Sequence, residues 1–381
     1  MNLHIFPDDK FIDEFITIAN SVNPNSNTFI VNASKPLRYV KSQCVYIAEY
    51  GSQEFDAIAG DLSQYRRVYI HFLTDAMCHF INNHADNNFI LFWVFWGADL
   101  YKYIPYPLLD ETTLLYLKTG HYKISSGLLG AIRSRIAKQH EHSERARAIK
   151  KLAYVLHFDE DEYKLILRYF PTKAKYQYFS YPNLLQLDYL DQPTDISVLK
   201  AVAQDIGMKL DKKIVLLGNS GWETGNHLSV LQGFAANKRD DYQVVVPLSY
   251  GNPEYIEYVI RQGKRLLGNK FVPLTTFLAP QTYSQLIKVV DYGIFNSRRT
   301  QGVGNIIALL YIGKKVFLNP MSTYYHFLNR KGVTFSSIDL LFSKVIEPLD
   351  STSGEKNREI IRGMYSNKSS EETIRMILNI E

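Results

Sequence analysis

The stretch KIVLLGNSGWETGNHLSVLQGFAAN, residues 213–237, decides the fold class of this chain. Lys213–Leu217 is a short apolar run that is typical of a buried strand, and the turn Gly218-Asn219-Ser220-Gly221 follows it. Apolar residues then recur at helical spacing from about Asn226 to Asn237. A strand, a tight turn and a helix form the repeating unit of a parallel, doubly wound sheet. We therefore expect an α/β domain around this stretch.

The same alternation continues toward both ends of the chain. A first series predicts strands at Thr28–Asn32, Val45–Ala48, Val68–Phe72, Phe89–Trp96, Ala153–His157 and Tyr178–Tyr181. A second predicts strands at Lys213–Leu217, Tyr242–Pro247, Phe271–Pro273, Tyr292–Phe295 and Lys315–Leu318. The polar segment Asn183–Val198 separates the two series and is expected to be a linker. We expect two Rossmann-like domains, residues 1–185 and 186–350, that face each other across a cleft, and C-terminal helices at 351–381 that can pack back on the first domain.

Composition excludes several classes of protein. Of 381 residues, 46% are hydrophobic and 21% charged, which fits a soluble globular chain of two domains. The net charge of +5 is too small to indicate nucleic-acid binding. The two cysteines, Cys44 and Cys78, form no CxxC pair and fit a reducing compartment. Neither a signal peptide nor an apolar run of about 20 residues is present, so we expect a cytoplasmic protein with at most peripheral membrane contact.

One candidate anion site is the run Gln301-Gly302-Val303-Gly304-Asn305, which lies between the strand Tyr292–Phe295 and an apolar helix. Glycines let backbone N–H groups approach a ligand, and the helix N-terminus adds partial positive charge. The run lacks the Lys-Ser/Thr of a P-loop and the third glycine of a dinucleotide fingerprint. Arg298 and Arg299 just upstream could clamp phosphate oxygens. A tight turn with two solvated arginines explains the same residues, so both interpretations remain open.

A second candidate is the turn Gly218-Asn219-Ser220-Gly221, at the carboxyl end of its strand. Ligands of open α/β sheets bind at this end of the strands. The backbone and the side chains of Asn219 and Ser220 could therefore face a phosphate. Thr224, Asn226 and His227 follow at the expected helix start, and simple helix capping by Ser220 and Asn226 is the alternative.

Three residues at strand ends are candidates for proton transfer. Asp99 follows the apolar run Phe89–Trp96, and a carboxylate that faces a cleft beside Trp96 could act as a general base. Capping of the next helix explains Asp99 equally well. His71 and His157 also end strands, and they could face the cleft or be structural. The absence of HExxH, of GxSxG and of DxD at a strand end argues against metalloprotease and serine-hydrolase functions, and we expect neither a metal nor a cofactor.

A basic stretch runs from Arg133 to Lys151 and includes Arg145. The apolar residues Leu128, Leu129, Ile132 and Ile136 precede it at helical spacing, and Tyr103 and Tyr106 lie further upstream. A basic, amphipathic face with aromatic residues suits attachment to an anionic bilayer. A helix packed on its own sheet with a charged outer face would show the same pattern.

Taken together, four motifs resemble glycosyltransferase family 56, whose best-known members are bacterial 4-acetamido-4,6-dideoxy-D-galactose transferases of enterobacterial common antigen synthesis. They are FWGADLY (95–101), GNSG (218–221) with His227, VVVP (244–247) with Tyr250, and RTQGVG (299–304). The resemblance extends over about Val68 to Val333. The first sixty residues and the tail after Pro348 match poorly.

The resemblance implies a GT-B fold, with a nucleotide-sugar donor on the second domain and a lipid-linked acceptor on the first. In the family the donor is a dTDP-sugar and the acceptor an undecaprenyl-diphosphate-linked saccharide at the inner face of the cell membrane. The donor would be held by Gly218, Asn219, Ser220, Arg299, Gln301, Gly302, Gly304 and Asn305, with Asn319 near the nucleoside. His71 matches a family histidine on the acceptor side.

In that reaction the dipole of the helix expected at Asn305–Tyr311 and the Arg299 guanidinium would supply the charge that a metal supplies elsewhere. Asp99 would deprotonate the acceptor if the anomeric centre is inverted, and would orient it if configuration is retained. The sequence departs from the family between Gly97 and His157 and at Trp222-Glu223-Thr224-Gly225, which leaves acceptor and donor identity open. A nucleotide-sugar sensor and a GT-B epimerase, which needs no lipid acceptor, are the alternatives.

Overall fold

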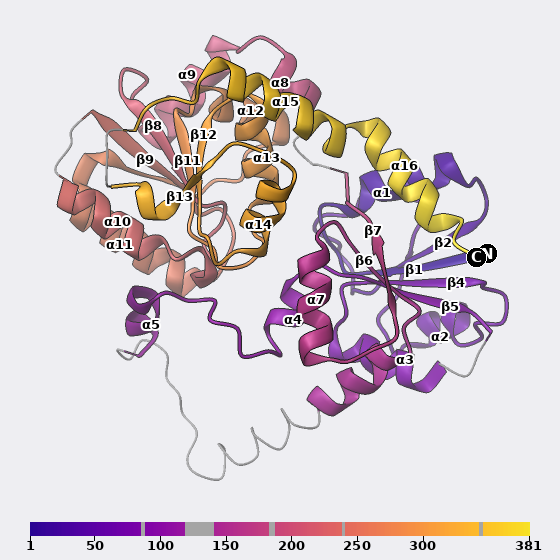
Figure 1. The fold of residues 1–381 in the computed structure, drawn as a ribbon. Coiled ribbons are helices and arrows are strands. Elements are labelled where there is room, and N and C mark those ends of the chain that lie inside the picture. Colours follow the sequence, from indigo (N-terminus) through magenta and orange to yellow (C-terminus); the bar gives the residue numbers. More distant parts are fainter. Residues whose placement is uncertain (85–87, 119–140, 183–186, 238–240, 343–345) are drawn as a thin grey trace. The chain divides into compact units, whose positions relative to one another are not determined.

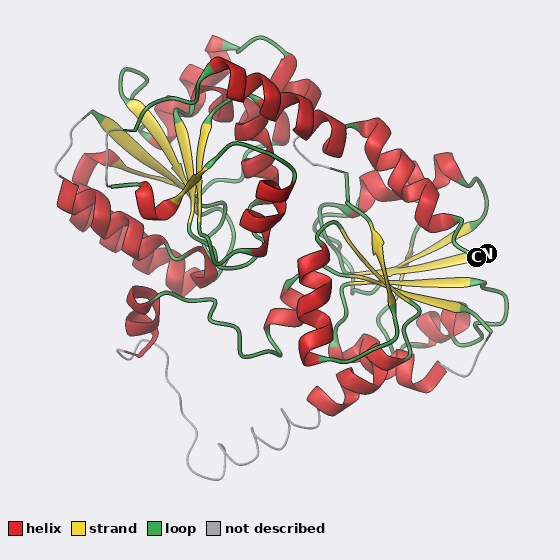
Figure 2. Ribbon diagram, viewed as in Figure 1, coloured by secondary structure: helices red, strands yellow, loops and turns green. Residues whose placement is uncertain are grey.

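A computed structural model describes all of the 381 residues except 85–87, 119–140, 183–186, 238–240 and 343–345. The chain divides into two compact units. Unit 1 comprises Met1–Tyr106, Ile124–Pro182 and Asn367–Glu381, and unit 2 comprises Pro107–Lys123 and Asn183–Ser366. In each unit, helices cover both faces of a central sheet (Figures 1 and 2).

Within the described residues, unit 1 contains a seven-stranded sheet in the order β3-β2-β1-β4-β5-β6-β7. All of its pairings are parallel, as the alternation of strands and helices predicts. The strands are β1 (Asn2–Phe6), β2 (Asn27–Val31), β3 (Tyr46–Ile47), β4 (Arg67–His71), β5 (Ile90–Val94), β6 (Tyr154–His157) and β7 (Lys175–Tyr178).

Strand β1 lies in the middle of this sheet, yet the apolar patterns above do not predict it. All five of its residues are buried, but Asn2 and His4 interrupt the apolar run. Asn2 Nδ2 donates to Asn27 Oδ1 at 2.9 Å, and His4 Nδ1 lies 3.1 Å from Nε2 of His71. Buried polar groups need such partners. Because these partners come from β2 and β4, the local pattern carries no signal for them.

The helices of unit 1 bury apolar faces against this sheet. Phe15 of α1 and Ile377 of α16 join Phe6, Phe29 and Tyr69 of the strands in one buried cluster. Helices α1 and α16 lie side by side over that face (Figure 1). The helices are α1 (Ile12–Val22), α2 (Gln53–Ala59), α3 (Asp75–His84), α4 (Ala98–Tyr101), α7 (Glu160–Tyr169) and α16 (Asn367–Leu378), and residues 141–150 are also helical.

Unit 2 contains, among the described residues, a six-stranded parallel sheet in the order β10-β9-β8-β11-β12-β13. Its strands are β8 (Lys213–Leu217), β9 (Tyr242–Pro247), β10 (Phe271–Leu274), β11 (Tyr292–Phe295), β12 (Lys315–Leu318) and β13 (Ser336–Ser337). The predicted bounds of β8, β9, β11 and β12 are confirmed, because each is a continuous apolar run between polar residues.

The helices of unit 2 include one from the first half of the sequence, α5, whose Tyr116 ring lies 3.9 Å from the ring of Tyr258 on α11. The α-helices are α5 (Glu111–Lys118), α8 (Leu187–Asp191), α9 (Ile196–Ile206), α10 (His227–Asn237), α11 (Pro253–Leu267), α12 (Pro280–Val289), α13 (Val303–Tyr311), α14 (Thr323–Arg330) and α15 (Ser351–Tyr365). The 3-10 helices are η1 (Glu223–Gly225), η2 (Gly268–Lys270) and η3 (Ile338–Leu340). None of the helices in the described part of the chain is long and apolar enough to span a bilayer.

The segment Asn183–Val198, expected to be a linker, is largely helical where it is described. It contains α8, whose Leu187 and Leu190 are buried, and the start of α9. The Asp195 carboxylate accepts the Ser197 and Val198 N–H groups and so caps α9. High polarity fits short amphipathic helices with acidic caps as well as a linker, so the composition of this segment did not reveal its helices.

Candidate functional site

The carboxyl edge of the unit 2 sheet brings the two predicted glycine-containing loops together. Strands β8 and β11 pair through Ile294 and Leu217, but the chain leaves β8 toward β9 and leaves β11 toward β12. Such a reversal is the topological switch point, where open α/β sheets bind ligands. The loop after β8 begins with Gly218, and the loop after β11 leads to Gly302.

The side chain of Gln301 links these two loops. Its Oε1 atom accepts a hydrogen bond from Thr224 Oγ1 at 2.7 Å. Its Nε2 atom lies 3.4 Å from Asn219 Oδ1 and 3.4 Å from Ser220 Oγ. Asn219 in turn donates to the Tyr250 hydroxyl at 3.1 Å. The structure thus places Asn219, Ser220 and Gln301 in one polar cluster, as expected for a shared ligand.

Gly302 has the close-approach geometry expected of a glycine in a ligand loop. Its φ is +74°, a left-handed conformation, and it precedes α13 without capping that helix through a side chain. A Cβ there would lie 3.1 Å from Phe295 Cδ1 and 3.2 Å from Asn219 Oδ1. Gly302 therefore lets the start of α13, which contains Gly304, lie close to Asn219, and a helix N-terminus is suited to an anion.

The two arginines of this loop have different partners. Arg298 Nη1 donates to the Leu109 carbonyl at 2.8 Å and to the Pro107 carbonyl at 3.3 Å, so it anchors the segment before α5. Arg299 Nη1 donates to the Thr300 carbonyl at 3.2 Å. Main-chain acceptors engage Nη1 of Arg298, which favours a structural role for this arginine, and Arg299 stays the predicted phosphate clamp.

Two of the expected donor residues are turned toward other protein groups. Asn305 Nδ2 donates to the Tyr283 hydroxyl at 3.0 Å, on α12. Asn319 Nδ2 donates to Asn296 Oδ1 at 2.8 Å, and Asn319 Oδ1 accepts the Met321 N–H at 2.9 Å. Both side chains are nearly buried and lie outside the Gln301 cluster.

The sequence did not reveal a buried polar network that lies next to this loop. Asn226, with φ +49°, donates through Nδ2 to the Asn296 carbonyl at 3.1 Å, and its Oδ1 accepts the Asp110 N–H at 2.9 Å. The Asp110 carboxylate accepts the hydroxyl of Ser229 at 2.5 Å. A polar residue before a helix was the available signal, but it gave no hint of Asp110, which lies 116 residues away in sequence.

Asp99 lies at the carboxyl edge of the unit 1 sheet, as predicted, but its carboxylate is buried and occupied. Oδ2 accepts the Leu73 N–H at 3.0 Å and the Trp93 indole N–H at 2.8 Å, while Oδ1 accepts the Trp96 N–H at 3.1 Å. The residue is 1% exposed. Burial raises the pKa of this carboxyl, and the three N–H donors act against that rise. This geometry favours a role in holding the loops after β4 and β5 over that of a general base.

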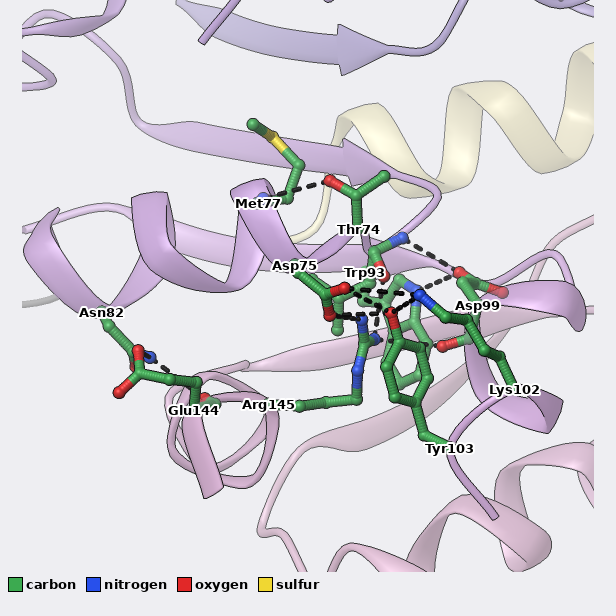
Figure 3. Close-up of polar contacts among 11 residues, drawn as sticks. Thr74, Asp75, Met77, Asn82, Trp93, Asp99, Lys102, Tyr103, Glu144 and Arg145 are labelled. Carbon is green, nitrogen blue, oxygen red and sulfur yellow. Dashed lines mark hydrogen bonds and ion pairs between the residues drawn. The ribbon is translucent and has the colours of Figure 1, made fainter. Parts of the chain in front are cut away.

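Arg145 braces the same loops (Figure 3). Its Nη1 donates to the Leu73 carbonyl at 2.8 Å and the Asp99 carbonyl at 3.0 Å, and its Nη2 donates to Asp75 Oδ1 at 2.9 Å. The guanidinium carbon lies 3.6 Å from the centroid of the Tyr103 ring. Because Arg145 is 0% exposed, it cannot belong to a membrane-facing basic surface. The expectation was wrong for Arg145, while residues 128–138 of that stretch lie outside the described residues.

His71 is buried between two polar neighbours. Its Nε2 lies 3.1 Å from His4 Nδ1, and its Nδ1 is hydrogen-bonded to the Tyr181 hydroxyl, which also accepts the Trp96 indole N–H at 3.3 Å. Burial lowers the pKa of His71 well below its ordinary value. A substrate would therefore meet Tyr181 before His71. His157, the other strand-end histidine, is buried and bonded to the backbone of Asp159, which is a structural role.

A family model for 4-alpha-L-fucosyltransferases, glycosyl transferase group 56, matches residues 148–353, more than half of the chain. The chain belongs to this family. It is therefore a glycosyltransferase, which transfers a sugar from a nucleotide-sugar donor. The match includes three of the four motifs above, and the FWGADLY run (95–101) precedes it.

Solved structures show that this group 56 chain has the GT-B fold. A glycosyltransferase from Rickettsia africae ESF-5 superposes with a TM-score of 0.68 at 13% identity, covering 100% of this chain and 99% of that chain. HepE of Anabaena, solved in complex with UDP and glucose, gives a TM-score of 0.66 at 10% identity, covering 99% of each chain. WaaG, a glycosyltransferase involved in lipopolysaccharide biosynthesis, gives 0.53 at 12% identity, covering 100% of this chain and 96% of that chain.

Proposed function

We propose that this group 56 enzyme transfers a deoxy-amino sugar from a nucleoside diphosphate to a hydroxyl of an undecaprenyl-diphosphate-linked saccharide in surface polysaccharide synthesis. The carrying observation is the Gln301 cluster at the switch point of unit 2, in a chain that belongs to a glycosyltransferase family. Unit 2 then binds the donor and unit 1 the acceptor.

In this proposal the donor diphosphate lies on the Gly218–Ser220 and Gln301–Gly304 loops. The backbone N–H groups of these loops, the N-terminus of α13 and the Arg299 guanidinium bind the negative charge that develops on the leaving diphosphate. Charge at the leaving group is supplied by this chain's own residues, which supports a metal-independent reaction. Asn305 and Asn319 support the loop through Tyr283 and Asn296, and contact the donor only if those side chains turn.

The proposed donor is dTDP-4-acetamido-4,6-dideoxygalactose or a similar sugar nucleotide. Fucose is 6-deoxygalactose, so this sugar shares the carbon skeleton that the family's description names. The nucleotide-sugar class also agrees with HepE, whose structures contain UDP and UDP-glucose. A peripheral position at the inner face of the cell membrane would give unit 1 access to a lipid-linked acceptor.

On the acceptor side, Asp99 and His71 act in this proposal through other groups. Asp99 holds the backbone of Leu73 and Trp96, and His71 holds the Tyr181 hydroxyl. Both would position the edge of unit 1 and leave the contact with the acceptor to neighbouring side chains.

The test is thermal unfolding of the full chain with dTDP, UDP, GDP and CMP in parallel. A nucleotide at one hundred times its Kd stabilises the folded state by about 2.7 kcal/mol, and we expect dTDP to raise the Tm most. Arg299→Ala should remove most of this rise because it removes a charged diphosphate ligand. Arg261→Ala, an exposed arginine on α11, should leave the rise unchanged. If no nucleotide changes the Tm, or if Arg299→Ala responds like the wild type, the donor site is misplaced.

A further inference from the structure

Four partly exposed aromatic rings meet at the carboxyl edge of unit 1. Phe11 follows β1, Phe72 follows β4, Trp96 follows β5 and Tyr181 follows β7. The Trp96 ring centroid lies 6.0 Å from Phe11, 5.5 Å from Phe72 and 5.6 Å from Tyr181. Partly exposed rings with polar tips are typical of sites that bind amphipathic ligands such as sugar rings.

The backbone of Phe72 is strained at this position. Its φ is +73°, a left-handed conformation that a bulky residue rarely adopts. The Phe72 N–H donates to the Val94 carbonyl at 3.1 Å, and the Thr74 N–H donates to the Phe72 carbonyl at 3.0 Å, so the surroundings impose it. Strain of this kind gathers at ligand sites. It places the Phe72 ring beside Trp96.

Asp9 lies in the loop that also contains Phe11, and one of its carboxylate oxygens lacks the hydrogen-bond partners that the nearby carboxylates have. Its Oδ1 atom is buried and has no hydrogen-bond partner among the described residues. Both oxygens of Asp8 accept backbone N–H groups of residues 38–40, and both oxygens of Asp99 are occupied as described above. Burial raises the pKa of Asp9, while the charge of Lys10 and hydrogen bonds from the backbone N–H groups of Lys10 and Phe11 act against that rise. A buried carboxylate oxygen without a partner costs stability, and a catalytic role beside an aromatic cluster is one explanation for such a group.

We propose that Asp9 is the residue that takes the proton of the acceptor hydroxyl, and that Phe11, Phe72, Trp96 and Tyr181 hold the acceptor saccharide. This inference rests on the proposed function and assigns the acceptor subsite within it. The acceptor O–H bond breaks and its proton moves to the Asp9 carboxylate. The freed oxygen forms a bond to the anomeric carbon, and the bond from that carbon to the diphosphate breaks with its electron pair on the departing nucleoside diphosphate. Asp9 returns the proton to solvent, and a single displacement inverts the anomeric centre.

The charged and titratable groups around Asp9 determine how activity depends on pH. Lys10 lowers the pKa of Asp9 and Asp8 raises it, both from the same loop. Burial raises the pKa of Tyr181, and the charges of Asp9 and Asp99 add to that rise. His71 is hydrogen-bonded to the Tyr181 hydroxyl. Only the deprotonated carboxylate accepts a proton, so activity should fall as pH drops through the raised pKa of Asp9.

The experiment compares the full-length wild type with Asp9→Asn and Asp9→Glu, using dTDP-4-acetamido-4,6-dideoxygalactose and an undecaprenyl-diphosphate-linked saccharide. We expect Asp9→Asn to lower kcat by at least about 100-fold, to abolish the acidic limb of the pH profile and to keep the dTDP-induced rise in Tm. Its Tm without ligand should equal or exceed that of the wild type, because the buried Oδ1 atom without a partner no longer carries charge. Asp9→Glu should recover part of the activity.

Asp8→Asn is the matched control, since it changes the neighbouring carboxylate whose oxygens are all occupied. It should lower the Tm and keep an acidic limb, moved toward lower pH because the Asp8 charge that raises the pKa of Asp9 is removed. Trp96→Ala should raise KM for the acceptor at least several-fold without changing the response to dTDP.

Three results would overturn the inference while the proposed function stands: near wild-type kcat in Asp9→Asn, an unchanged acidic limb in that variant, or a product with retained anomeric configuration. If the wild type binds dTDP but gives no turnover with any lipid-linked saccharide, the proposed function itself fails, and the role of Asp9 fails with it.

Discussion

At the scale of single residues, the loop around Gly302 shows why side-chain size matters next to the Gln301 cluster. Gly302 has φ +74°, and Asn219 and Phe295 occupy the space that a Cβ would need. Left-handed backbone costs an ordinary L-residue roughly 1–2 kcal/mol. The same glycine brings the start of α13 close to Asn219. Both the backbone conformation of this loop and the space for the proposed donor therefore depend on Gly302.

Gly302→Ala is expected to lower the free energy of unfolding by about 1–2 kcal/mol and to weaken dTDP binding. Denaturant unfolding measures the first effect, and the nucleotide-induced change in Tm measures the second. Gly363→Ala in α15 is the control, because no atom lies within 4 Å of its added Cβ. Gly363→Ala should leave the free energy of unfolding unchanged or raise it by up to about 1 kcal/mol. Equal behaviour of the two variants would contradict this account of Gly302.

At the scale of elements, α16 shows how the C-terminal segment completes unit 1. The Tyr69 hydroxyl on β4 donates to the Ile377 carbonyl at 2.7 Å, and Arg67 Nε donates to the Ile380 carbonyl at 2.7 Å. Ile374, Ile377 and Leu378 are 0% exposed and belong to one buried cluster with residues of β1, β2, β4, β5 and β6. Helix α16 therefore covers apolar surface that the first half of the chain leaves uncovered, more than 300 residues away in sequence.

Ile377→Ala should destabilise unit 1 by about 2–5 kcal/mol, the usual cost of truncating a fully buried isoleucine. Met376→Ala changes the adjacent side chain, which is 51% exposed, and should alter stability by no more than about 0.5 kcal/mol. Both values come from chemical denaturation followed by circular dichroism. Similar losses in the two variants would show that α16 does not pack on the sheet through this face.

At the scale of the whole molecule, both units contain buried, neutral histidines. Burial lowers the pKa of His4 to about 3, and the pKa values of His157 and His227 to about 4. It also lowers the pKa of His71 well below its ordinary value. In the unfolded chain each histidine titrates near 6.5, so acid protonates the unfolded state first.

These shifts predict that stability is complete above pH 6.5 and is lost as pH falls toward the folded-state pKa values. Between pH 7 and pH 5 each such histidine should reduce the free energy of unfolding by roughly 2 kcal/mol. Calorimetry across this range should therefore show a steep fall in Tm. His227→Gln should flatten the fall, while His79→Gln, on the exposed surface of α3, should not. A Tm that is constant from pH 7 to pH 5 would contradict the burial of neutral histidines.

Much of the fold follows from the sequence alone. Continuous apolar runs such as Lys213–Leu217 predict parallel strands, and the glycines at 218 and 302 predict the two loops that meet at the switch point. These features are visible because strand burial and tight turns are encoded within a few neighbouring residues. The resemblance to family 56 is also carried by short motifs, and the family match agrees with it.

What only the tertiary structure decided concerns polar residues whose partners are distant in sequence. Strand β1 escaped prediction because His4 is paired with His71, 67 residues away. Arg145 resembled a surface cation until the structure placed it among Leu73, Asp75, Asp99 and Tyr103. Asp8, Asp9 and Asp99 are alike as sequence letters, yet only Asp9 retains an oxygen without a partner among the described residues. A carboxylate's reactivity depends on which donors surround it, and packing alone brings those donors together.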